Sequence, residues 1–420
     1  MNWRIPLFKP EFGADELEAV QRPVRDQWLT MGPIVAELEA EFQRRTGAGA
    51  AIAVTNGTAA LHLALLANGV GPGDEVIVPS LTFVASANAV RYCGAKVVFC
   101  DICGENDLTL DVADVERKMT SRTKAIVAVH YAGFPVDIRP LLDLAASHKV
   151  NVIEDCAHAL ITHLDGKALG TFGACGCFSF FSNKNMTCGE GGMVTTDCED
   201  IARKIRLLRS HGMTAMTLDR HEGHAWSYDC IETGWNFRID EIRASLALAQ
   251  LGRLDDFMAR RREVRRQYLE GLRGLNLQVP FSGAFARGGA EVAVHIMPVL
   301  LPRGVRRQMV MEALKIEGIQ SSIHYPPAHL FTAVPSNERI SLERTEDVAA
   351  RELTLPFFPS MSTSEVQQVC RALGKAIGAS DGGRGRPPCT MDTPILPPGG
   401  RSASTAVSQG QAMRNGGCPC

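Results

Sequence analysis

The chain has 420 residues, 45% of them hydrophobic, which is enough for two cores of ordinary size. Its 44 lysine and arginine residues are balanced by 46 acidic ones, so it lacks the strong positive field that a nucleic-acid partner usually requires. No run approaches the roughly 18 apolar residues of a membrane span, and the start lacks the apolar core of a signal peptide, so we expect a cytoplasmic protein that binds small molecules and neither nucleic acid nor membrane.

The first half of the chain alternates short apolar runs with helical stretches. Runs of this kind, rich in β-branched residues, are typical of strands buried on both faces, which indicates a largely parallel α/β sheet. Two further runs, residues 177–181 and 193–196, have glycines between them and predict neighbouring strands without helical crossovers. The earlier runs are residues 51–54, 75–78, 96–99, 125–129 and 151–153.

The second half predicts a smaller α+β unit. Residues 242–268 form a long helical pattern that would bridge two domains. The elements predicted after it are strands at 291–301 and 319–324, an amphipathic helix at 305–317 and a closing helix at 364–377.

These elements predict a large domain over residues 1–250, which includes the N-terminal segment, and a small C-terminal domain over 251–378. Residues 379–420 are dense in Gly, Pro, Ser and Arg without apolar periodicity, so we expect a disordered tail. The 13 cysteines show no zinc-type double pairing, and no metal site is predicted. Cys175 and Cys177 lie in a run of small and aromatic residues and are expected to be buried, reduced thiols.

Lys184 stands where a lysine could form an imine. It follows an apolar strand and precedes the glycine turn at 189–192, where the backbone can come close to a ligand. A lysine becomes a nucleophile when its surroundings lower its pKa or hold a carbonyl cofactor against it. Taken alone, Lys184 is more typical of a solvated loop residue.

Two further features support a cofactor site. Asp155 ends the strand at 151–153, at the edge where open α/β sheets bind ligands. A carboxylate there could pair with the pyridinium nitrogen of pyridoxal phosphate (PLP) and keep the ring able to accept electrons. At Gly57 and Thr58 a strand gives way to an alanine-rich helix, whose free amides predict an anion site. Each feature also has a simpler interpretation as a helix cap.

Taken together, short motifs along the chain resemble the DegT/DnrJ/EryC1/StrS sugar aminotransferases, which have the aspartate-aminotransferase fold (PLP fold type I). The motifs follow the family's order and approximate spacing, and only the tail is uncovered. They are WLTMGP at 28–33, NGT at 56–58, PSLTFVAS at 79–86, EDCAH at 154–158, FSF at 178–180, KN at 184–185, GEGGM at 189–193, GWNFR at 234–238 and HYPP at 324–327.

The resemblance implies a set of catalytic and cofactor contacts around PLP. Lys184 would carry the cofactor as a Schiff base, Asp155 would face the ring nitrogen, and His158 would approach the phenolic oxygen. Phe83 would stack on one face of the ring. The freed amine of Lys184 would then move the proton between the donor's α-carbon and the cofactor.

The resemblance also implies a homodimer with shared active sites. Gly57, Thr58 and Ser179 would hold the cofactor phosphate, joined by Asn236 from the neighbouring subunit. Residues of the motifs at 28–33 and 324–327, and the arginine at the end of the motif at 234–238, are assigned to substrate binding. These residues are Thr30, Arg238, His324 and Tyr325, of which Arg238 suits a carboxylate because of its bidentate fork.

As implied by the family, the reaction moves an amino group from an amino acid, L-glutamate, to a keto-sugar, most simply a nucleotide-linked keto-deoxysugar. Amination of a cyclitol ketone and a non-catalytic regulatory protein on the same fold are the alternatives. A sugar dehydratase of this fold has histidine in place of the lysine, and Lys184 counts against it. Met31 and Cys188 depart from the family's pattern and are expected near the substrate side.

Overall fold

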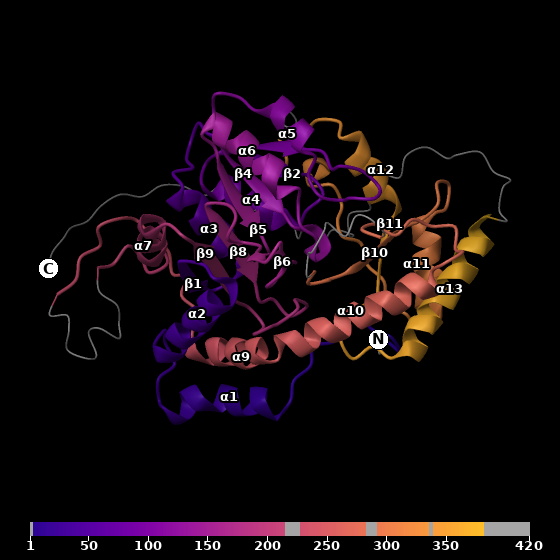
Figure 1. Ribbon diagram of the computed structural model, residues 1–420, viewed down its shortest axis with the longest axis horizontal. Helices are drawn as coiled ribbons and strands as arrows, with labels where there is room; N and C mark the ends of the chain where they lie inside the picture. The colour runs from indigo at the N-terminus through magenta and orange to yellow at the C-terminus, as the bar shows by residue number, and fades with distance from the viewer. Residues whose placement is uncertain (1–2, 215–226, 283–291, 336–338, 382–420) are drawn as a thin grey trace, which may run out of the picture. The chain divides into compact units, whose positions relative to one another are not determined.

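The computed structural model describes residues 3–214, 227–282, 292–335 and 339–381. A seven-stranded sheet forms the core of its larger part, beside the elements α10 to α13 (Figure 1). The strand order is β1-β9-β8-β5-β4-β2-β3. Neighbours from β3 to β8 are parallel, whereas β9 is antiparallel to both β8 and β1. The predicted, mainly parallel α/β sheet is therefore confirmed. The strands are β1 (Ala50–Val54), β2 (Glu75–Pro79), β3 (Lys96–Cys100), β4 (Thr123–Val129), β5 (Asn151–Asp155), β8 (Cys175–Ser179) and β9 (Gly192–Thr196).

The sheet is covered by helices on both faces because its strands present apolar side chains to each. In β4, Ile126 and Ala128 join the core under α2, α5, α6 and α9, while Ala125 and Val127 join the core under α3, α4 and α7. This double burial explains the continuous apolar runs of the sequence. The helices are α2 (Pro33–Thr46), α3 (Gly57–Ala67), α4 (Val84–Tyr92), α5 (Val112–Lys118), α6 (Ile138–His148), α7 (Glu199–Leu208) and α9 (Glu241–Gly252).

Strand β8 begins and ends two residues earlier than predicted, at Cys175 and Ser179. Phe180 and Phe181 lie beyond it and begin the loop that leads to Lys184. The small residues at the start of β8 obscured its beginning in the sequence. Cys175 and Cys177 are free and buried in β8, as predicted.

The predicted long helix is two helices in the structure, α9 and α10 (Leu254–Gly271), which lie end to end (Figure 1). They are separated at Arg253, whose φ of −98° and ψ of 0° depart from helical geometry. Arg253 donates a hydrogen bond of 2.8 Å to Glu16 of α1 (Ala14–Arg25), and α1 packs along α9. The break was not predictable from the apolar spacing, which continues through it.

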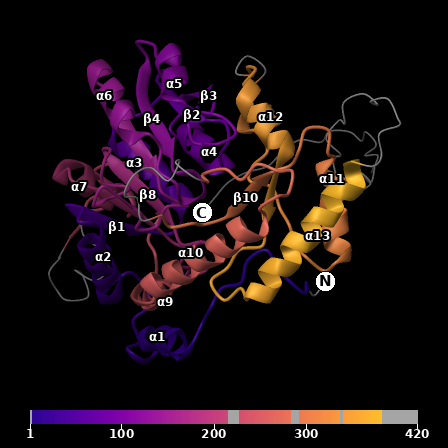
Figure 2. The same ribbon diagram turned by 45° about the vertical axis from the view of Figure 1, so that its right-hand side comes forward.

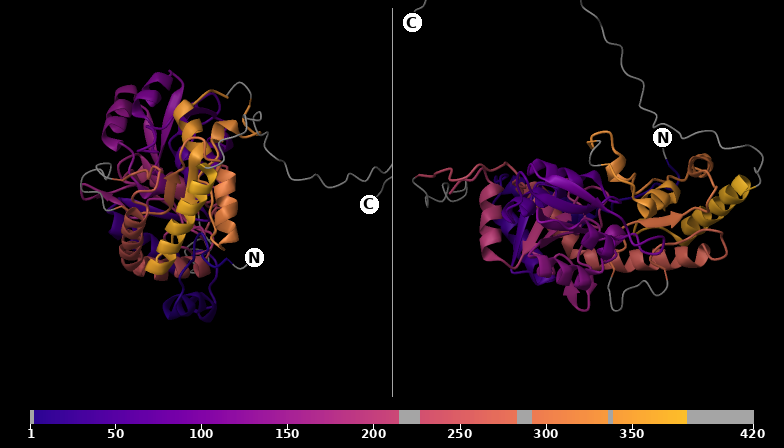
Figure 3. Two further views of the ribbon diagram at one scale, coloured as in Figure 1. Left: turned by 90° about the vertical axis from the view of Figure 1, so that its right-hand side faces the viewer. Right: turned by 90° about the horizontal axis from the view of Figure 1, so that it is seen from above.

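The C-terminal part of the chain builds a two-stranded antiparallel sheet of β10 (Met297–Leu300) and β11 (Glu352–Leu355). Helices α11 (Arg307–Ile316) and α13 (Thr363–Asp381) lie side by side next to this sheet (Figures 2 and 3), and α10 packs on α13. The predicted strand at 291–301 starts only at Met297, and residues 283–291 lie outside the described chain.

The predicted strand at 319–324 is wrong. Only single pairings occur there, between Ile319 and Ile5 and between Ser322 and Thr354. At its end the main chain of His324 bonds to the side chain of Glu352 instead of continuing a strand ladder.

Helix α13 extends to Asp381, so the first residues of the predicted tail are helical, and 382–420 lie outside the described residues. The predicted boundaries at 250 and 378 stay predictions. Among the described residues, no helix combines the length and apolar character needed to cross a membrane.

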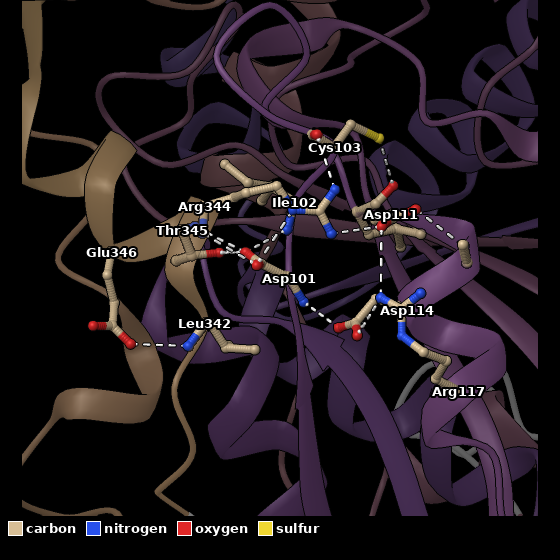
Figure 4. A network of polar contacts seen from close by, with 12 residues as sticks. Asp101, Ile102, Cys103, Asp111, Asp114, Arg117, Leu342, Arg344, Thr345 and Glu346 are labelled. Carbon is tan, nitrogen blue, oxygen red and sulfur yellow. Dashed lines mark hydrogen bonds and ion pairs between the residues drawn. The ribbon is translucent and has the colours of Figure 1, made fainter.

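Asp101, which follows β3, caps helix α12 (Glu343–Arg351) from a distant part of the sequence (Figure 4). Its carboxylate accepts hydrogen bonds from the main-chain nitrogen of Thr345 at 2.8 Å, the Thr345 hydroxyl at 2.7 Å and the main-chain nitrogen of Arg344 at 3.2 Å. Arg344 also donates to Asp111 at 2.6 Å. Burial raises the pKa of Asp101, but hydrogen bonds from Thr345, Ile102 and Arg344 outweigh this and lower it overall. The first turn of α12 is thus fixed to the edge of the large sheet.

We expect Asp101→Ala to lower the free energy of unfolding by about 2 kcal/mol, because two helix amides lose their acceptor in a buried place. Asp101→Asn keeps one oxygen and should lose about half as much. Urea denaturation at neutral pH measures both. The control is Asp26→Ala, which removes an exposed ion pair with Arg22 at 3.8 Å and should cost under about 0.5 kcal/mol. Equal losses at positions 101 and 26 would show that α12 does not depend on Asp101.

Candidate active site

A cavity of about 590 Å³ opens at the carboxyl ends of β5 and β8, the edge at which open α/β sheets bind ligands. Its volume is in the range of small-molecule and cofactor sites. Most of the site residues predicted from the sequence line it. They are Gly57, Thr58, Phe83, Asp155, His158, Ser179, Lys184, His324 and Tyr325.

Lys184 reaches the cavity from the loop after β8, where its main-chain nitrogen donates to the carbonyl of Phe181 at 2.9 Å. Burial lowers the pKa of its amine to about 8, against the opposing pull of the Asp155 carboxylate. At pH 7 about a tenth of the amine is therefore neutral and nucleophilic, far more than for a free lysine. Lys184 is half-buried and lines the cavity, so it is not a fully solvated loop lysine, and its role as the Schiff-base lysine stays a prediction.

Asp155 is the last residue of β5 and is held by two donors. The hydroxyl of Ser86, on α4, donates to Oδ2 at 2.7 Å, and the main-chain nitrogen of Ala157 donates to Oδ1 at 3.1 Å. Ser86 is itself 2.9 Å from the hydroxyl of Thr82. Ser86 belongs to the motif at 79–86, but its contact with Asp155 was not predictable, because the bond joins residues far apart in the chain.

The start of α3 leaves two amides available. Asn56 caps the helix by accepting from the main-chain nitrogen of Ala59 at 2.8 Å, and the amides of Gly57 and Thr58 have no acceptor among the described residues. A Cβ at position 57 would lie 2.8 Å from the Cβ of Ser179. Glycine therefore lets the Ser179 hydroxyl approach the same point, which makes a site for an anion.

His158 and Tyr325 form a pair that the sequence did not predict. The main-chain nitrogen of Ala132 donates to Nδ1 of His158 at 3.2 Å, and Nε2 lies 2.9 Å from the Tyr325 hydroxyl. Burial, with smaller contributions from Lys184 and His324, lowers the pKa of His158 well below its usual range. A neutral ring whose Nδ1 accepts must carry its hydrogen on Nε2. His158 therefore donates to Tyr325, whose own hydrogen is left to point elsewhere.

Thr30, Asn236 and Arg238 do not line the cavity of this chain. Asn236 is exposed between Trp235 and Phe237, whose rings pack on His62 of α3 with centroids 4.9 and 6.0 Å away. Those two contacts fix the backbone and direct Asn236 outward.

Thr30 and Arg238 differ in their surroundings. Thr30 is partly buried in the turn between α1 and α2. Burial, and after it the charge of Arg209, lowers the pKa of Arg238, which has no carboxylate partner among the described residues. A desolvated arginine without a partner is suited to an incoming anion.

The two departures from the family pattern, Met31 and Cys188, lie against the apolar core, and neither lines the cavity. Burial raises the pKa of the Cys188 thiol to about 12. The expectation that they lie on the substrate side finds no support in this chain.

A buried group of His130, Glu154 and Cys156 has ligand atoms close enough to hold a metal ion. Both oxygens of Glu154 are already used. One accepts from Nε2 of His130 at 3.0 Å and from Gly170, and the other accepts from Phe172 and Gly173 at 2.7 Å each. The group therefore serves to hold the loop after β5, and the expectation that the protein needs no metal stays a prediction.

The residues present fit PLP. Free amides at a helix start suit its phosphate, a carboxylate fixed at the strand end suits its ring nitrogen, and a lysine of lowered pKa suits its aldehyde. The fold and the cavity thus define a PLP-dependent enzyme. The DegT/DnrJ/EryC1/StrS aminotransferase family matches residues 10–374. The chain belongs to this family of PLP-dependent aminotransferases, and the predicted cofactor and enzyme class are confirmed.

Solved structures agree over nearly the whole chain. The aminotransferase TlmJ from Streptoalloteichus hindustanus is 32% identical, with a TM-score of 0.83 over 89% of this chain and 99% of that chain. Spr1654 from Streptococcus pneumoniae has been solved in its PLP form and in its pyridoxamine phosphate (PMP) form. The PMP form is 26% identical, with a TM-score of 0.83 over 90% of this chain and 100% of that chain. The sugar aminotransferase CalS13 from Micromonospora echinospora is 29% identical, with a TM-score of 0.79 over 88% and 99%.

Proposed function

We propose that the protein transfers the amino group of L-glutamate to a nucleotide-linked keto-deoxysugar and so supplies an amino sugar for a glycan or secondary metabolite. The observation that carries the transamination is Lys184, an amine of lowered pKa that lines the same cavity as the fixed carboxylate of Asp155. The sugar acceptor is supported by the similarity to CalS13, a sugar aminotransferase.

The residues of the cavity divide the work of holding the cofactor. The amides of Gly57 and Thr58 and the hydroxyl of Ser179 would hold the phosphate, and Phe83, which is 56% exposed, would cover the ring. Asp155 would keep a proton on the ring nitrogen. Bound PLP supplies an aldehyde that a primary amine can attack and a ring that accepts an electron pair.

Lys184 and its neighbours would move the protons. Lys184 would act at Nζ, where its amine would take the proton from the donor's α-carbon and give it back in a later step. Its lowered pKa suits this role, because an amine that titrates near the working pH can both accept and donate a proton. His158, whose Nε2 lies 2.9 Å from the Tyr325 hydroxyl, would act near the phenolic oxygen of the cofactor.

The proposal includes a homodimer with shared active sites. Asn236 and Arg238 lie outside the cavity of their own chain, and the partly buried rings of Trp235 and Phe237 hold Asn236 outward. In the dimer, Asn236 would complete the phosphate site of the partner. Arg238, with Thr30, would meet the substrate, and the donor carboxylate is the group that its unpaired guanidinium would bind.

We expect the purified protein to be yellow, with a cofactor absorption band that L-glutamate shifts and a suitable acceptor restores. A panel of keto-sugar nucleotides and a cyclitol ketone, each followed by mass spectrometry of the aminated product, identifies the acceptor. Restoration by the cyclitol ketone alone would replace the sugar proposal with the cyclitol alternative. A colourless protein that takes up no PLP on reconstitution would leave only a regulatory role.

A further inference from the structure

Two side chains of β11 form a closed ring of hydrogen bonds behind His324. Glu352 and Thr354 are each 1% exposed and lie on the same face of the strand. One oxygen of Glu352 accepts from the main-chain nitrogen of His324 at 2.8 Å, and the other accepts from the Thr354 hydroxyl at 2.5 Å. The Thr354 oxygen is in turn 2.8 Å from Nδ1 of His324. The ring fixes both the backbone and the imidazole of His324.

His324 lines the cavity, so the state of its ring bears on whatever binds there. Nδ1 is taken by Thr354, and Nε2 has no partner among the described residues. Burial, and after it the charge of Lys184, lowers the pKa of His324 to about 3. The imidazole is therefore neutral near neutral pH, with one hydrogen shared between two nitrogens. The nitrogen that carries the hydrogen decides whether Nε2 donates or accepts.

Among the three residues joined by these hydrogen bonds, Glu352 is the one whose charge can change near neutral pH. Burial raises the pKa of its carboxyl to about 7, against hydrogen bonds from Thr354 and His324 and the charge of Arg307. Arg307 donates to the main-chain oxygen of Glu352 at 2.9 Å. The titratable groups that face Glu352 are Arg307 of α11, Tyr131 of the short helix η1 (Tyr131–Gly133), and His324 and Tyr325 of the loop before α12.

The hydroxyl of Thr354 has a single hydrogen, which links the two ends of the ring. When Glu352 is ionised, the Thr354 hydroxyl donates a hydrogen bond to the carboxylate. The Thr354 oxygen then accepts a hydrogen bond from Nδ1–H of His324, and Nε2 carries no hydrogen. A proton that arrives at Nε2 from the cavity lets Nδ1 release its hydrogen to Thr354. Thr354 then passes its own hydrogen to Glu352. One proton has moved from the cavity to the carboxyl, and His324 is again neutral with its hydrogen on Nε2.

We propose that Glu352 and Thr354 are positioning residues that form a proton relay behind His324, so that the protonation state of a buried carboxyl sets whether Nε2 of His324 accepts or donates a hydrogen bond in the cavity. The effect on substrates rests on the proposed function, whereas the relay itself is a property of the three residues. A carboxylate or ketone oxygen needs a donor, so the protonated form of the relay favours binding of these groups.

Variants at two positions separate the steps of the relay. Glu352→Gln has an amide oxygen for the His324 nitrogen and an amide hydrogen for Thr354, so it should hold the hydrogen on Nε2 at every pH. Thr354→Val cuts the link while leaving Glu352 on the His324 backbone. Thr354→Ser keeps a hydroxyl and is the matched control. The readout is the ring ¹⁵N resonances of His324 in holoenzyme labelled with ¹⁵N-histidine, assigned by their loss in His324→Asn.

We expect the protonated ring nitrogen to change from Nε2 to Nδ1 as the pH rises through about 7, in the wild type and in Thr354→Ser. In Glu352→Gln it should stay Nε2 throughout, and Thr354→Val should show no change of nitrogen near that pH. A wild-type ring with the same protonated nitrogen over the whole range would overturn the relay. So would a transition in Thr354→Val equal to that of the wild type.

Steady-state kinetics supply a second readout. The KM for L-glutamate should rise about three- to tenfold between about pH 6 and about pH 8 in the wild type, the effect of one hydrogen bond, and stay flat in Glu352→Gln, with kcat little changed. If the enzyme transaminates normally but the tautomer of His324 does not change with pH, the relay is refuted and the proposed function is not. Failure to take up PLP sinks the proposed function instead, and the ring nitrogens can still be read without turnover.

Discussion

Lys184→Ala is expected to reduce transamination by about four orders of magnitude, because it removes both the amine that holds the cofactor and the base that moves the α-proton. The variant should still bind PLP through the contacts of Gly57, Asp155 and Ser179, but reversibly. Borohydride reduction followed by mass spectrometry distinguishes the two states. The wild type should gain the mass of the cofactor permanently, and the variant should not.

The same substitution separates chemistry from folding. No hydrogen bond of the Lys184 side chain contributes to the described structure, and a buried amine is costly to keep charged, so the cofactor-free variant should be no less stable than the wild type at neutral pH. A small primary amine added to the variant should restore part of the rate. The control is Lys375→Ala, an exposed lysine of α13. Wild-type turnover or permanent labelling in Lys184→Ala would refute its assigned role.

The sequence predicted the parts of the site that depend on position along a single element. Asp155 could be recognised because it ends a buried strand, and Lys184 because it follows one and precedes a glycine turn. The strands around them were predicted for the same reason, since a sheet buried on both faces requires continuous apolar runs. The long apolar spacing of α9 and α10 hid the break at Arg253, which depends on Glu16 of another helix.

The contacts that join distant segments were not predictable. Ser86 holds Asp155 across a sequence separation of 69 residues, and Tyr325 meets His158 across 167. Glu352 gave no signal at all, because a glutamate beside an apolar run is typical of a solvated strand end. Only the fold buries it and places it on His324. The protonation states of His158, His324 and Glu352 therefore depend on contacts between distant segments, which the local sequence does not reveal.

Mixing Asn236→Ala with Lys184→Ala is expected to restore activity that neither homodimer has. In the proposed dimer, each site takes Lys184 from one chain and Asn236 from the other. One site of a mixed dimer is then whole, and the second carries both defects. Random reassortment makes about half of the dimers mixed, each with one good site of two, so recovery should approach about a quarter of wild-type activity.

The control mixes Lys184→Ala with Asp155→Ala, two residues that line the cavity of the same chain. Each site of that mixed dimer keeps one defect, so no recovery is expected, and the comparison removes any general effect of mixing. Subunit exchange is verified by mass spectrometry of differently labelled chains. If exchange occurs and the asparagine pair recovers no more than the control pair, Asn236 does not serve the partner's site. Its exposure between Trp235 and Phe237 would then need another explanation.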